Sequence, residues 1–240
     1  MHIIHMLIVV TVVFMIALFL MCLFRRKLYH PVFNPLFVGS AALLILAWNY
    51  AMYEHNGLKN GLIIMENISP YICTVIAVTP LLNQKVKDYA YSAIAFLGFG
   101  MFLAMFISPE FEYLFNYEQE AELVHVSEAA CHVLMGIYGF YLILSDRVTL
   151  TLRSFAKAAI FMYASIGFGV FLNLILHRSF FGMNMYGRYS IYFLDIFGSF
   201  EITLIAYLVG VLGTLALGFL VGSLLDRLSR ARKVHEDPLP

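Results

Sequence analysis

Titratable side chains that could carry out chemistry gather on one face of the segment 123–144. His125, Glu128 and His132 are spaced by three and four residues, which places them on the same side of a helix. Glu128 can then orient either imidazole and support it as a general base. The same three residues could instead bind a metal ion, or form a polar seam that holds helices together. We favour the acid–base interpretation and predict neither a metal nor a cofactor.

A candidate nucleophile, Cys73, lies in an earlier apolar segment at a similar depth. It is eleven residues beyond Leu62, about 16 Å along a helix axis, and His132 is nine residues beyond Leu123, about 13 Å. A thiol beside an imidazole and a carboxylate would supply a nucleophile, a base and an orienting group. A buried cysteine also packs as a small apolar residue, so this alternative stays open. Cys131 points about 100° away from His132 around the helix, which indicates packing.

Further polar residues could bind a substrate at the same end of these segments. Pro70 cannot donate a hydrogen bond to the carbonyl of Glu66, so it should open the helix locally beside Asn67. Such an opening could line a wet cavity. The inner halves of the same segments contain almost no comparable residues. The full set of predicted substrate contacts is Glu66, Asn67, Asn173, Asn184, Tyr186, Arg188 and Glu201.

The composition shows which solvent must surround these residues. Of the 240 residues, 62% are hydrophobic and 12% are charged, against about 25% charged in soluble domains. The mean hydropathy is +0.84, so the chain needs a bilayer. Its formal net charge is zero, which gives no basic excess for nucleic acid. Three cysteines without paired spacing predict neither a disulfide framework nor a zinc site.

Seven apolar stretches are long enough to cross a bilayer core of about 30 Å. We expect an all-α, polytopic protein of the cell membrane, with residues 1–226 as the membrane domain and 227–240 as a disordered cytoplasmic tail. Twelve of the 15 Lys and Arg residues follow odd-numbered stretches, which predicts an outside N-terminus and an inside C-terminus. The stretches are Ile3–Phe24, Pro35–Tyr53, Leu62–Leu82, Tyr89–Ser108, Leu123–Leu144, Phe155–His177 and Phe193–Val221.

Glycines recur inside the fourth, fifth and seventh of these stretches, and one more follows directly after the seventh. Small residues let helices in a membrane approach closely, so we interpret the glycines as helix contacts rather than as binding sites. The residues are Gly98, Gly100, Gly136, Gly139, Gly210, Gly213, Gly218 and Gly222.

The run from Glu66 to Cys73, with Thr79-Pro80-Leu81-Leu82 after it, resembles the third span of the YwaF-like bacterial membrane proteins. The order along the chain is also similar to that of these proteins: first the histidines of the fifth stretch, then Asn173, then Asn184-Met185-Tyr186. The resemblance implies a distant relation to a eukaryotic multipass acyltransferase for ether phospholipids and to the androgen-induced family of fatty-acid-ester hydrolases. It also implies a buried nucleophile, Cys73 or in its place Thr74, paired with His132 or His125.

These observations lead to hypotheses from three classes. The first is a Cys/His acyltransferase or lipid-ester hydrolase that works through a thioester, with a polar cavity open to the outer leaflet and membrane lipid as partner. The second is a small-solute or proton/cation transporter, or a receptor, that uses intramembrane Glu and His residues. The third is an assembly partner without turnover. The sequence gives no oligomeric state.

Overall fold

The computed structural model describes residues 3–56, 68–107, 122–176, 180–181 and 199–236, and within these ranges the chain is helical, without strands. Two short 3-10 helices, η1 and η4, connect longer α-helices. In chain order the elements are α1 (Ile3–Leu23), η1 (Arg25–Tyr29), α2 (Phe33–Asn56), α3 (Ile68–Val78), η4 (Thr79–Leu81), α4 (Gln84–Ile107), α6 (Glu122–Leu144), α7 (Leu152–Leu176) and α9 (Phe200–Glu236).

Four of these helices are long and apolar enough to cross a membrane. They contain the stretches Phe33–Ala51, Val126–Leu144, Leu152–Ile175 and Glu201–Ala231. The predicted all-α membrane class is therefore confirmed at this level, while the total of seven spans stays a prediction. In α1 and α3 the apolar stretches among the described residues are shorter.

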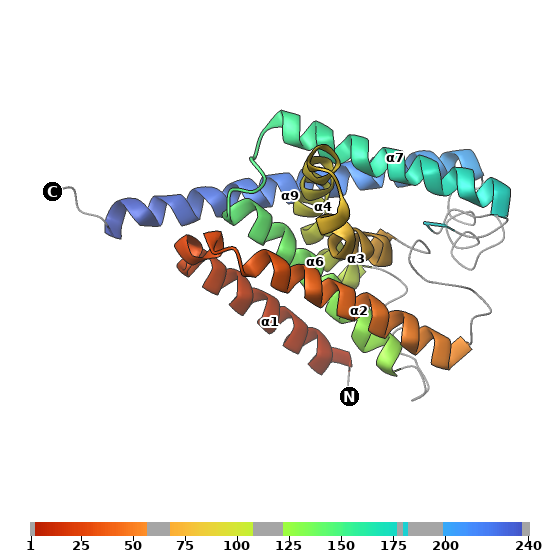
Figure 1. The fold of residues 1–240 in the computed structure, drawn as a ribbon, viewed down its shortest axis with the longest axis horizontal. Helices are drawn as coiled ribbons and strands as arrows, with labels where there is room; N and C mark the ends of the chain where they lie inside the picture. Colours follow the sequence, from red (N-terminus) through yellow and green to blue (C-terminus); the bar gives the residue numbers. More distant parts are fainter. Residues whose placement is uncertain (1–2, 57–67, 108–121, 177–179, 182–198, 237–240) are drawn as a thin grey trace.

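Helix α4 lies at the centre of the bundle (Figure 1), and residues 90–97 are buried around its whole circumference. It contacts α6, α7 and α9, while α1 and α2 pack against α6 on the other side. The outer helices expose large apolar side chains such as Leu43, Leu174 and Leu220. Exposed apolar surface on this scale suits contact with lipid tails rather than water.

Glycines set how closely α4 approaches its neighbours. A Cβ atom added at Gly98 would lie 2.3 Å from the carbonyl oxygen of Met135, and one added at Gly218 would lie 1.8 Å from that of Phe96. The predicted close contacts are thus confirmed at both positions. At Gly213, in contrast, an added Cβ would meet no heavy atom within 4 Å. The same holds for Gly210.

Helix α9 continues through Glu236, well past the apolar stretch expected to end at Val221. Its C-terminal part extends beyond the rest of the bundle (Figure 1) and includes most of the segment predicted as a disordered tail. Two factors account for the extension. Leu, Arg, Lys and Ala are good helix formers, and Ser229 is buried and accepts a hydrogen bond from Arg25 in η1.

Candidate functional site

Cys73 lies where three helices meet. Its Sγ is 3.5 Å from Sγ of Cys131 on α6 and 3.6 Å from the carbonyl oxygen of Ala41 on α2. Both cysteines are fully buried, and both are free thiols. Helices α3 and α6 are therefore neighbours, a point that the sequence left open.

His132 connects α6 to the central helix α4. Its Nδ1 is 2.6 Å from the carbonyl oxygen of Met101, and because a carbonyl can only accept, Nδ1 carries a hydrogen. Its Nε2 lies 4.0 Å from Oε1 of Glu128. The histidine is 6% exposed. This separation is too long for a direct hydrogen bond, but a carboxylate at this distance stabilises the imidazole electrostatically once Nε2 takes up a proton. The pair can therefore act as an acid–base unit.

The predicted nucleophile and base lie at one level of α3 and α6 but have different immediate partners. Cys73 contacts Cys131, the residue that precedes His132 in α6. The imidazole contacts Met101 and Glu128 instead. Cys131, which its spacing assigned to packing, is thus the α6 side chain that meets the thiol. His125 is the fourth residue of α6. Its side chain is outside the described part of the chain.

Pro70 is the third described residue of α3, and it is buried. The opening predicted around Glu66 lies outside the described residues. Thr74, the substitute nucleophile suggested by the resemblance, donates its hydroxyl to the Pro70 carbonyl over 2.8 Å. Its hydroxyl proton is therefore engaged in the helix backbone.

Asn173 positions the chain that follows α7. Its Nδ2 donates to the carbonyl of Phe180 over 3.2 Å, and its Oδ1 accepts from the Phe180 N–H over 2.6 Å. This reciprocal pair places Phe181 inside the bundle, where its ring packs edge-on against Tyr71 with centroids 5.1 Å apart. Tyr71 in turn hydrogen-bonds Ser165 on α7 over 2.7 Å. In this arrangement Asn173 supports the structure around α3.

Of the other predicted substrate contacts, Glu201 is exposed in the first turn of α9, where its charge suits the positive end of the helix dipole. The remainder lie outside the described residues: Glu66, Asn67, Asn184, Tyr186 and Arg188.

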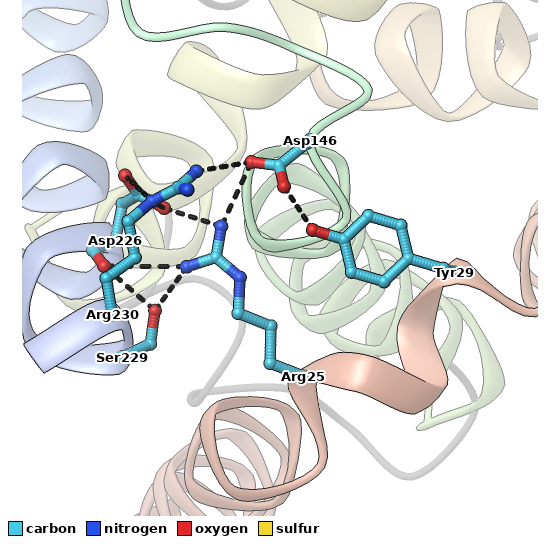
Figure 2. Close-up of polar contacts among 6 residues, drawn as sticks. All are labelled: Arg25, Tyr29, Asp146, Asp226, Ser229 and Arg230. Carbon is cyan, nitrogen blue, oxygen red and sulfur yellow. Dashed lines mark hydrogen bonds and ion pairs between the residues drawn. The ribbon is translucent and has the colours of Figure 1, made fainter. Parts of the chain in front are cut away.

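A second polar group, which residue types and spacing do not predict, lies just after the end of α1 (Figure 2). We call it the ionic cluster; it consists of Arg25, Tyr29, Asp146, Asp226, Ser229 and Arg230. Arg25 is its buried centre, 3% exposed. One guanidinium nitrogen, Nη2, is 3.0 Å from Asp146 and 2.7 Å from Asp226, and the other donates to Ser229. The cluster thereby ties η1 to the α6–α7 connection and to α9.

Asp146 receives three of these interactions at a residue with the unusual φ of +56°. Its carboxylate accepts from the Tyr29 hydroxyl, from Arg25 and from Arg230. Partial burial on its own would raise the pKa of Asp146, but these partners outweigh it, and the pKa lies below its usual range. The pKa of Tyr29 is raised, first by burial and then by its hydrogen bond to Asp146.

The low pKa of Asp146 predicts a stability loss in acid. A carboxyl whose pKa is depressed in the folded state stabilises it above the unfolded-state value, about 3.9. This contribution disappears as the pH falls through the lower folded-state pKa. Asp146→Asn should therefore reduce folding stability at neutral pH. It should also make the loss of stability with falling pH less steep below about pH 4. Thermal unfolding in detergent across this range tests it, with Asp88→Asn as control, because Asp88 is a half-exposed α4 residue whose ion-pair partner is Lys157. If the stability of wild type and of Asp146→Asn fell equally steeply with decreasing pH, the prediction would be contradicted.

Buried tyrosines extend from this cluster into the bundle. Tyr138 donates to Oδ1 of Asn34 over 2.8 Å, and its ring stacks on Tyr141 at 5.7 Å. The Tyr141 hydroxyl accepts from Nε of Arg147 over 3.1 Å. This half of α6 thus holds buried polar groups, where we had expected almost none.

Among the described residues, no three His, Cys, Asp or Glu side chains gather as a group that could hold a metal ion. The metal alternative for His125, Glu128 and His132 depends on a side chain outside that part. Comparison with known proteins finds no matching protein family, no matching curated protein and no matching solved structure.

Proposed function

We propose that the chain is a multi-pass protein of the cell membrane that crosses the bilayer seven times. Four helices have the length and hydropathy for this, and α1, α3 with η4, and α4 occupy the other predicted positions. The distribution of Lys and Arg supports an outside N-terminus and an inside C-terminus. In this orientation the ionic cluster is cytoplasmic, and the Glu128–His132 pair lies toward the outer leaflet.

We further propose that the protein transfers or hydrolyses lipid acyl groups, with Cys73 as the nucleophile. The observation that carries this proposal is the contact of Cys73 with α6 at Cys131, one residue from His132 and its carboxylate partner. Membership of the YwaF-like family, which the motifs suggest, belongs to the same proposal. A buried thiol among apolar helices suits an acyl chain that enters sideways from the bilayer.

Each of these residues has its own role in the proposed reaction. His132 takes the thiol proton at Nε2, because Nδ1 is held by the Met101 carbonyl. Glu128 stabilises the imidazolium. The Cys73 sulfur attacks the acyl carbonyl, the alcohol leaves with a proton from the imidazolium, and a thioester remains. An acceptor alcohol or water then attacks the thioester and releases the thiol. For the first step the Cys73 side chain must turn from Cys131 toward the imidazole.

Labelling with an alkyne-tagged fatty-acyl p-nitrophenyl ester tests this proposal. We expect wild type to acquire a hydroxylamine-sensitive label, the sign of a thioester. Cys73→Ala should abolish the label, and His132→Gln should slow labelling about 100-fold or more, the usual effect of removing a general base. Cys131→Ala is the matched control, because it removes an equally buried thiol in contact with the first. Equal labelling of Cys73→Ala and wild type would exclude the proposed nucleophile.

One observation favours the second candidate, a proton or cation carrier. Buried polar side chains continue along α6 beyond the Glu128–His132 pair, at Tyr138 and Tyr141. Such a column could form part of a path across the bundle. In sealed vesicles, a pH-gradient-dependent proton flux that Glu128→Gln abolishes, together with unchanged acyl labelling, would favour this candidate.

A further inference from the structure

Cys73 and Cys131 bring two thiols together from distant parts of the chain. They are 58 positions apart, yet their sulfurs are separated by 3.5 Å. A disulfide holds its sulfurs at about 2.05 Å, so an approach of about 1.5 Å would close the bond. The third cysteine, Cys22, lies on α1 and is only partly buried. The chain therefore has one close pair and one thiol apart from it.

We propose that Cys73 and Cys131 form a reversible disulfide that links α3 to α6 when a small peroxide oxidises them. The inference concerns these two sulfurs alone and does not depend on acyl transfer. Disulfide formation would replace a packing contact between two helices with a covalent bond, closing a loop that contains the whole chain between residues 73 and 131.

The burial of the pair selects the kind of oxidant. Both sulfurs have no exposed surface and are buried among apolar helices, so a charged, water-soluble disulfide such as oxidised glutathione cannot reach them. Hydrogen peroxide is uncharged and about the size of water, which lets it enter where helices move apart only slightly. The acid–base pair Glu128–His132 lies beside Cys131 on the same helix and can accept a thiol proton.

The reaction proceeds in two balanced steps. In the first, one sulfur attacks peroxide, the O–O bond breaks, and the products are a sulfenic acid and water. In the second, the other sulfur attacks the sulfenic sulfur, the S–O bond breaks, and a second water leaves with the last thiol proton. Two thiols and one peroxide thus give one disulfide and two waters. The short distance favours the second step over further oxidation.

Counting free thiols after oxidation tests the proposal. The full-length protein in detergent is treated with hydrogen peroxide, unfolded, and alkylated with N-ethylmaleimide. We expect alkylated sites to fall from three to one in wild type and from two to none in Cys22→Ser. Dithiothreitol should restore both. Cys131→Ser should form no intramolecular disulfide, and peptide mass spectrometry of wild type should find Cys73 linked to Cys131.

Three results would overturn the proposal. Wild type could keep three alkylated sites when a small exposed dithiol added to the same sample is fully oxidised. The linked peptide could contain Cys22 or join two chains. Oxidised glutathione could produce the Cys73–Cys131 link as fast as peroxide, which would contradict the role of burial. Acyl labelling of untreated protein is scored separately, so a failure of the proposed enzyme leaves this result unaffected.

Discussion

Gly218→Ala is expected to lower the free energy of unfolding by about 3 kcal/mol or more, because it overpacks the contact between α9 and α4. The new Cβ would lie 1.8 Å from the carbonyl oxygen of Phe96 and 2.6 Å from its carbon. These are backbone atoms of a central helix, which cannot rotate away as a side chain can. Relief therefore requires α9 to move, and the edge-on contact of the Phe96 and Phe219 rings would be lost with it.

Gly213→Ala is the matched control on the same helix. Its added Cβ would meet nothing within 4 Å, so alanine's higher helix propensity should leave stability unchanged or raise it by up to about 1 kcal/mol. Thermal or SDS-induced unfolding in detergent, followed by circular dichroism, gives the comparison. Equal stability of the two variants would show that α9 does not pack against α4 at Gly218.

The difference between these glycines illustrates what the sequence can predict. A small residue in an apolar stretch indicates that a close helix contact is possible. Whether a neighbour occupies that space depends on the rotation of each helix about its axis, which eight glycines at irregular spacing do not specify. Gly98 and Gly218 face α4–α6 and α4–α9 contacts, while Gly210 and Gly213 face open space.

The positions of the helices were the more predictable part, because the width of the bilayer dictates the length of an apolar run. The expected stretch Leu123–Leu144 differs by one residue from α6. The end of α9 was missed for a related reason. Hydropathy marks where a helix leaves the membrane, and not where its backbone hydrogen bonds stop, so α9 continues to Glu236.

The candidate site was less predictable, because its partners are not visible as residue types. His132 binds the backbone carbonyl of Met101, a group that every residue possesses. The meeting of Cys73 with Cys131 requires the orientation of two helices. From the sequence, Arg25 indicates only topology, since a basic residue after an apolar stretch is common on the cytoplasmic side. Its burial follows from contacts with residues more than 100 positions away.

Arg25→Ala is expected to destabilise the protein by about 3 kcal/mol, in the range for breaking a buried ion pair by removing one partner. The substitution leaves Asp226 and Ser229 without the group that holds them to η1. Arg26→Ala is the matched control, since it removes the same side chain from the next, exposed position. A surface charge usually contributes up to about 1 kcal/mol.

The contacts of the ionic cluster also predict which segment should unfold first in Arg25→Ala. Arg25 holds Asp226 and Ser229, so its removal should release the C-terminal part of α9 before the bundle unfolds. Limited trypsin digestion followed by mass spectrometry should then show faster cleavage after Arg227 and Arg230 in Arg25→Ala than in Arg26→Ala. A double-mutant cycle of Arg25→Ala with Asp226→Ala isolates the energy of their 2.7 Å contact. Zero coupling together with unchanged cleavage would mean that apolar packing alone holds α9 in place. A positive coupling would show that the ionic cluster holds the C-terminal part of α9 to η1.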